Sequence, residues 1–168
     1  NAEEKDYPAY YPNKRVTFEF NGESFGAFNK ALEGYARETV QSLSYQPIPT
    51  VAKGYYEVGT HKIVMNSRLT DSEKAKTLIH ELAHAKMHGE NSPYKDTTTR
   101  EQEMQAEMTA YVVAKSFGLD PADESIHYVA NWTGKFAEIE DVEKNLAAIQ
   151  KTAREMIQAI DMHYGLEL

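Results

Sequence analysis

The stretch His80-Glu81-Leu82-Ala83-His84 decides both the fold and the chemistry expected of this chain. Two histidines four positions apart leave a helix about 40° from one another, so both rings can bind one metal ion. Glu81 lies roughly 100° round the helix from His80, where its carboxylate can reach a metal-bound water rather than the metal itself. The motif therefore predicts a zinc site of the hydrolytic type.

The flanking residues predict the helix that this motif requires. Thr70 and Glu73 form a capping-box pattern, Asp71 and Glu73 suit the positive end of the helix dipole, and Gly89 is a typical stop after His88. We therefore expect a helix from Asp71 to His88. Its apolar residues fall opposite the two motif histidines, where they can pack into a core: Ala75, Leu78, Ile79, Leu82 and Ala85. The alternative is an amphipathic surface helix with two solvated histidines.

A catalytic zinc ion needs a third protein ligand and a position for water. Residues 100–117 read as a second helix, closed by Gly118, and Glu103, Glu107 and Tyr111 share one face of it at steps of four. We interpret Glu103 as the third ligand. Glu107 is then the residue that holds a histidine ligand through its free ring nitrogen. The order of these two roles stays open.

His88 is a less favoured candidate for the third ligand. A metzincin would carry its third histidine six residues after the second, where this chain has Glu90. On a straight helix the His88 ring would point roughly 80° away from that of His80. We interpret His88 as a helix-end histidine near the carbonyl dipole, or as a partner of a metal ligand.

Two features together resemble the gluzincin branch of the zincin metallopeptidases: the motif at 80–84 and the pair Glu103-x-x-x-Glu107 about twenty residues later. The run from Ile79 to His88 is similar to the ImmA/IrrE family. Three further runs resemble the zincin domain of ArdC-type antirestriction proteins and of large proteins of phages and conjugative elements: Glu103 to Tyr111, Phe117 to Asp120 and Tyr128 to Trp132.

The resemblance covers the chain from Tyr55 to its end and implies an α+β fold. This would be a zincin-like metallopeptidase, mainly helical, with a small antiparallel sheet beside the HExxH helix. One zinc ion per chain is implied, with an edge strand within Tyr55 to Met65 that pairs with an extended substrate. ArdC proteins carry an N-terminal single-stranded-DNA-binding domain, and nothing in this sequence resembles one.

Length and composition point to a compact domain. We expect residues 14–168 to form a single zincin-like domain behind a flexible arm at 1–13. The absence of cysteine excludes disulfides and thiolate ligands. A net charge of −8 argues against direct nucleic-acid binding. No apolar run reaches membrane length and no signal peptide is evident, so we expect a cytoplasmic protein without membrane contact. Because the chain starts at Asn1 rather than Met, we expect a processed product or a piece of a longer protein.

The remaining segments are predicted more coarsely. We expect a strand at Val16 to Phe20, a helix at Glu23 to Leu43, and an antiparallel hairpin of Gly54 to Glu57 with Lys62 to Asn66. A further helix should run from Asp120 through Trp132. The last helix carries an apolar stripe at steps of three and four: Ile139, Val142, Leu146, Ile149, Ala153, Met156 and Ile160. We expect it to pack on its own domain in a monomer, with a dimer contact as the alternative.

The predicted function is a zinc-dependent endopeptidase in which Glu81 acts as the general base. The oxyanion needs a donor, for which Tyr111, Tyr55, Tyr56 and His127 are candidates. The expected substrate is a regulatory or DNA-associated protein, and a phage or mobile element is the expected genetic setting. The alternatives are a non-catalytic zincin-fold binding or antirestriction module and a hydrolase of a non-peptide bond. His61 and His163 are expected to be surface residues.

Overall fold

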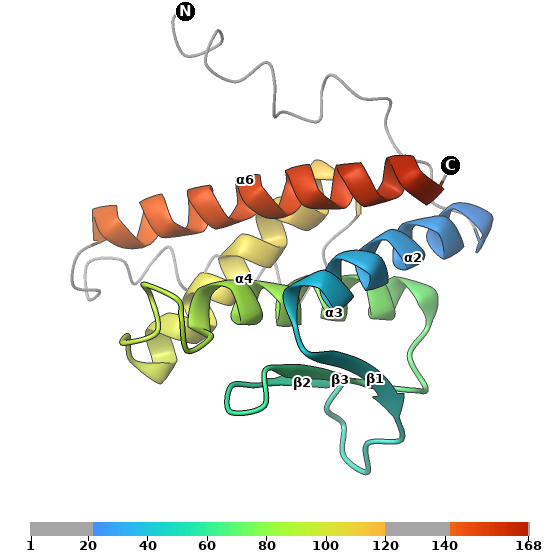
Figure 1. Cartoon of the computed structure of the whole chain (residues 1–168), viewed down its shortest axis with the longest axis horizontal. Helices are drawn as coiled ribbons and strands as arrows, with labels where there is room; N and C mark the ends of the chain where they lie inside the picture. Colours follow the sequence, from blue (N-terminus) through green and yellow to red (C-terminus); the bar gives the residue numbers. More distant parts are fainter. Residues whose placement is uncertain (1–21, 120–141, 168) are drawn as a thin grey trace, which may run out of the picture.

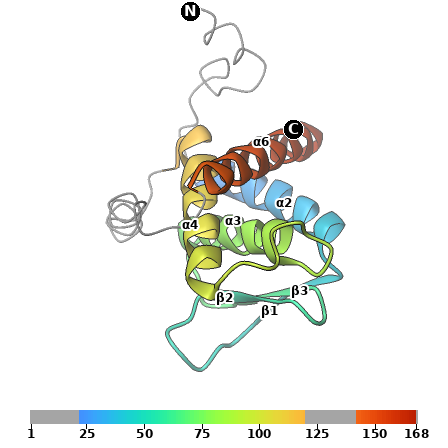
Figure 2. The ribbon, with the colours of Figure 1, turned by 90° about the vertical axis from the view of Figure 1, so that its left-hand side faces the viewer.

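The structure is a computed structural model that describes residues 22–119 and 142–167. A three-stranded sheet lies on one side of a helical layer, and the last helix lies on the other side (Figures 1 and 2). In chain order the elements are α2 (Gly22–Thr39), β1 (Ser42–Gln46), β2 (Gly54–Glu57), β3 (Lys62–Asn66), α3 (Asp71–His88), α4 (Thr99–Ser116) and α6 (Val142–Glu167). The expected α+β architecture, mainly helical with a small sheet beside the motif helix, is confirmed.

The site helix α3 has the bounds expected from its sequence. The capping box is present: the Glu73 amide donates to Thr70 Oγ1 at 3.2 Å, and the Thr70 amide donates to Glu73 Oε1 at 3.1 Å. The helix stops at Gly89, where a Cβ atom would come within 3.0 Å of the Ala85 carbonyl oxygen. Both ends of the site helix are therefore fixed by local contacts.

The second helix of the site, α4, is also close to its expected position. Thr98 caps its first turn by accepting a hydrogen bond from the Glu101 amide at 3.2 Å. Phe117 caps its end, and Gly118 follows with φ 81°, a conformation that costs glycine little. Both helices of the site therefore have defined ends.

The sheet differs from expectation in one strand. The order is β1-β3-β2, and the expected antiparallel hairpin of β2 and β3 is confirmed, with Gly54 opposite Met65 and Glu57 opposite Lys62. However, β1 pairs with β3 in parallel, so the sheet is mixed rather than wholly antiparallel. The predicted first helix was too long at its end. It stops at Thr39 because the residues that follow shortly after, Ser42–Gln46, extend to pair with β3.

The core lies between the sheet and α6, and α3 passes through it with contacts to α2, α4, α6 and the sheet. All five apolar residues predicted to face the core from α3 are buried. The described part of the apolar stripe on α6, from Leu146 to Ile160, packs on its own domain against α2 and α4, with Leu146 42% exposed and the later stripe residues buried. Ile139 and the side chain of Val142 lie outside the described residues. Burial of the apolar face of α3 therefore holds this helix in place beneath the site.

Several sequence predictions fall outside the described residues. These are the arm at 1–13, the strand at 16–20, the helix from Asp120 through Trp132, and His127. Among the helices that the structure does describe, none has the length and apolar character needed to cross a membrane.

Candidate metal centre

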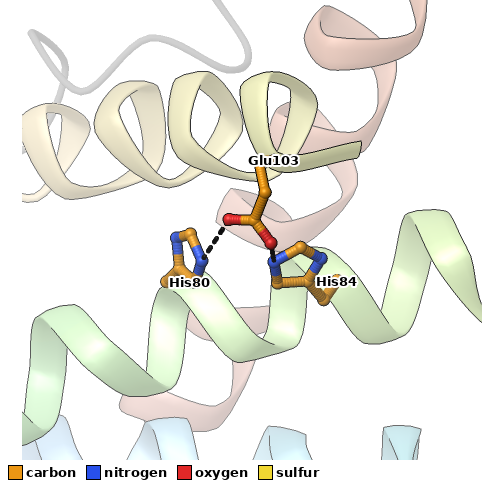
Figure 3. Close-up of side chains that lie close together, drawn as sticks. All are labelled: His80, His84 and Glu103. Carbon is orange, nitrogen blue, oxygen red and sulfur yellow. Dashed lines mark ion pairs between the residues drawn. The ribbon is translucent and has the colours of Figure 1, made fainter. Parts of the chain in front are cut away.

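Helices α3 and α4 pack against each other and bring three side chains together from two parts of the sequence (Figure 3). His80 and His84 come from α3, and Glu103 comes from the facing side of α4. One nitrogen or oxygen atom from each residue lies within 4.8 Å of the others. Glu103 Oε1 is 3.3 Å from His84 Nε2, and Glu103 Oε2 is 3.9 Å from His80 Nε2. The structure thus joins the motif histidines to the carboxylate interpreted as the third ligand.

Both histidines have their second ring nitrogen engaged elsewhere. The Nδ1 atom of His80 lies 3.0 Å from Glu107 Oε2, one turn further along α4 than Glu103. The Nδ1 atom of His84 lies 2.9 Å from His88 Nδ1. As a result, the Nε2 atom of each histidine faces Glu103, while the Nδ1 atom contacts a second residue. Histidines that bind metals usually have such a partner on their other nitrogen.

The donor set fits a metal ion. Two imidazole nitrogens and one carboxylate oxygen make up the His₂Glu set of catalytic zinc sites, which leaves a fourth position open. Three carboxylates, those of Glu81, Glu103 and Glu107, lie near His80, and Glu103 also contacts His84. This excess of negative charge favours a bound cation.

Glu81 is buried beside the two motif histidines. Its side chain is only 7% exposed, and its carboxylate accepts a hydrogen bond from the backbone amide of Tyr56 on β2. Burial raises the pKa of Glu81 above its usual value, against the opposing effect of His80 and His84. A carboxylate with a raised pKa is better matched to taking up and returning a proton near neutral pH.

The candidate ligands also shift one another's pKa values. Burial alone would lower the pKa of His80, but its hydrogen bond to Glu107 and the nearby charges of Glu81 and Glu103 outweigh burial and raise it. The hydrogen bond with His84 lowers the pKa of Glu103, so this carboxylate stays ionised. An ionised carboxylate facing two imidazoles is the state that binds a metal ion.

His88 contacts the candidate ligand His84, as in its interpretation as the partner of a metal ligand. His88 is buried, and its Nε2 atom lies 2.8 Å from Gln105 Oε1. Burial lowers its pKa to about 4, so the ring is neutral at neutral pH. In the sequence, the spacing of four residues between His84 and His88 was the only local signal for the contact between these two rings. No local signal marked Gln105, because only its contacts with His88 on α3 and Asn145 on α6 distinguish it from other polar helix residues.

The aromatic candidates for oxyanion stabilisation lie in different places. Tyr111 is half-buried on α4, one turn beyond Glu107. Tyr55 is exposed on β2, whereas the Tyr56 hydroxyl is engaged with His61 Nδ1 at 2.6 Å.

His61 and His163, which were expected to be surface residues, are partly buried, and each has a partner distant in sequence. His61 Nε2 donates to the Thr39 carbonyl at 2.7 Å, which ties the turn between β2 and β3 to the end of α2. His163 Nε2 pairs with Glu38 Oε2 at 2.9 Å. Both rings are partly buried by residues distant in sequence, which residue spacing alone does not reveal.

A cavity of about 830 Å³ opens elsewhere on the molecule. Its lining includes His61, Lys86, Glu90 and Glu155, and none of the three candidate metal ligands. Its walls carry charges of both signs. The candidate metal site therefore lies between the facing side chains of α3 and α4, and this cavity is not part of it.

An HExxH helix and a facing helix that supplies a glutamate define the class of the molecule as a metallopeptidase-like domain of the zincin type. Residues 23–132 match the M78 peptidase family, described as the IrrE N-terminal-like domain. The chain therefore belongs to the ImmA/IrrE family.

One relative extends beyond this domain. An uncharacterized protein of Bacillus anthracis is 31% identical over 171 residues, which cover 96% of this chain. The chain spans only 29% of the length of that protein. No solved structure matches the chain significantly.

Proposed function

We propose that this domain is a zinc-dependent endopeptidase. The observation that carries the proposal is the meeting of His80, His84 and Glu103 across two helices, with the buried carboxylate of Glu81 next to them. Membership of a peptidase family supports the same conclusion. A site that only stabilised the fold would have no use for a general base beside its ligands.

The proposed chemistry divides between the ion and the chain. When bound by His80, His84 and Glu103, zinc would supply the positive charge that polarises the peptide carbonyl and acidifies water. Glu81 takes the proton from the attacking water and returns it to the leaving amine. The Tyr56 amide keeps the Glu81 carboxylate in place for both transfers. We keep Tyr111 as the donor to the oxyanion because it shares the face of α4 that carries Glu103 and Glu107.

The substrate that we propose is an extended peptide segment. β2 is at the edge of the three-stranded sheet and packs against α3, and the amide of its residue Tyr56 is directed to Glu81. An extended segment can add to such an edge through backbone hydrogen bonds. By family resemblance we propose that the segment belongs to a regulatory protein in the cytoplasm. We propose further that the domain acts as a monomer encoded on a mobile element.

The proposal is tested with Glu81→Gln, which keeps the shape of the side chain but removes its basicity. Zinc-loaded natural chain and variant are incubated with a proteome, and new peptide N-termini are counted by mass spectrometry. We expect cleavage by the natural chain and a loss of about 100- to 10,000-fold in the variant, with zinc retained. Glu90→Gln, at an exposed residue beyond α3, is the matched control.

Two results would contradict the proposal. Equal cleavage by the Glu81→Gln variant would exclude Glu81 as the general base. Zinc binding without cleavage of any protein would instead favour a non-catalytic binding module, or a hydrolase of a non-peptide bond if a small amide is cleaved.

A further inference from the structure

A series of hydrogen bonds, partly buried at His84 and buried beyond it, runs from His84 to α6. His84 Nδ1 lies 2.9 Å from His88 Nδ1, and His88 Nε2 lies 2.8 Å from Gln105 Oε1. Gln105 Nε2 then donates to Asn145 Oδ1 at 2.6 Å. His88, Gln105 and Asn145 are only 4%, 2% and 6% exposed. These hydrogen bonds therefore connect α3 through α4 to α6 within the interior of the protein.

The direction of this series of hydrogen bonds follows from the chemistry of its first member. A neutral imidazole that binds a metal ion through Nε2 has its hydrogen on Nδ1. Two facing nitrogens can share only one hydrogen, so His88 Nδ1 must accept when His84 Nδ1 donates. His88 then has its hydrogen on Nε2 and donates it to the Gln105 oxygen, which directs the Gln105 amide group to Asn145.

The opposite direction is incompatible with metal binding. If His88 donated from Nδ1, His84 would accept there and would place its own hydrogen on Nε2. That hydrogen would occupy the position from which the ring faces Glu103. Only one of the two directions leaves a lone pair on His84 for a metal ion.

We propose that His88, Gln105 and Asn145 are positioning residues that fix the tautomer and orientation of His84 for metal binding. The inference rests on the proposed metal site and adds α6 to it, although α6 supplies none of the proposed ligands. The two histidines are then held differently. The Glu107 carboxylate holds His80. A series of uncharged side chains holds His84, and it ends at Asn145, 40 residues after Gln105 in the sequence.

Two substitutions of His88 separate this role from a purely structural one. Asparagine places its side-chain oxygen near the position of Nδ1 and can still accept from His84. Glutamine places its amide near the position of Nε2, where it can meet Gln105 but leaves His84 without its acceptor. Both variants break one buried link, so both should lose folding stability.

Zinc affinity, measured by competition with a chelator, should distinguish the two variants. We expect His88→Gln to weaken zinc binding about 10- to 100-fold and His88→Asn to stay close to the natural chain. Equal zinc affinities in the two variants would overturn the inference. His84→Ala is the reference: if it leaves zinc binding unchanged, the metal site itself is wrong. If His84→Ala loses zinc while His88→Gln does not, the metal site is supported but the positioning role of His88, Gln105 and Asn145 is excluded.

Nitrogen-15 NMR of the zinc-loaded natural chain tests the inference without any variant. The ring-nitrogen shifts should report hydrogen on Nδ1 of His84 and on Nε2 of His88. Hydrogen on His88 Nδ1, or zinc bound directly to His88, would overturn it.

Discussion

Glu107 Oε2 lies 3.0 Å from the Nδ1 atom of His80, on the opposite side of the ring from the nitrogen that faces Glu103. Glu103 and Glu107 are one turn apart on α4, so a single helix places a carboxylate in front of the ring and another behind it. This arrangement fixes the ring and increases its basicity, which are the two effects expected of a carboxylate that holds a metal-binding histidine.

Glu107→Ala is therefore expected to weaken zinc binding about 10- to 100-fold without removing a ligand. Glu107→Gln keeps an acceptor oxygen but loses the charge, so its effect should be smaller. Chelator competition measures both affinities, with Glu101→Ala in the first turn of the same helix as the control. An unchanged affinity in Glu107→Ala would show that the contact does not support the ligand.

The capping box of α3 makes a prediction about stability alone. Thr70→Ala removes the side-chain acceptor for the Glu73 amide and should lower the free energy of unfolding by about 0.5–2 kcal/mol. Thr70→Ser retains the acceptor and should stay near the natural value. Urea unfolding gives the free energies, and the zinc content of the folded Thr70→Ala variant should be unchanged. A loss of zinc at full folding would mean that the cap also shapes the site.

Stability at alkaline pH should depend on Tyr35. Burial raises the pKa of Tyr35 from 10 to about 12. Between these values the unfolded chain releases the phenolic proton first, so the free energy of unfolding falls as pH rises, by up to about 3 kcal/mol.

The Tyr35 prediction can be checked with Tyr35→Phe, which removes the titrating group and should flatten this part of the curve. Urea unfolding at pH 8 and pH 11 measures the difference. The same slope in the natural chain and in Tyr35→Phe would assign the effect to another group.

Local signals predicted the two site helices well. The bounds of α3 follow from Thr70, Glu73 and Gly89, which act within a few residues of the helix ends. For α4, Gly118 signalled the end. The facing pair His84 and Glu103 could be anticipated because two periodic helices constrain which residues can meet.

Long-range pairing explains what the sequence did not reveal. The strand β1, Ser42–Gln46, is a short polar segment whose partner β3 lies about twenty residues later, so no local period marks it. Gln105 and Asn145 are 40 residues apart, and their contact depends on how α4 and α6 pack. Such contacts are properties of the assembled core.

We propose that His80, His84 and Glu103 together hold one zinc ion. The most direct measurement is the metal content, by mass spectrometry, of protein purified without added zinc, for the natural chain, His84→Ala and Glu103→Ala. We expect one zinc ion per natural chain and none in either variant, with both variants still folded by circular dichroism. A natural chain without metal, or a Glu103→Ala variant that keeps its zinc, would contradict it.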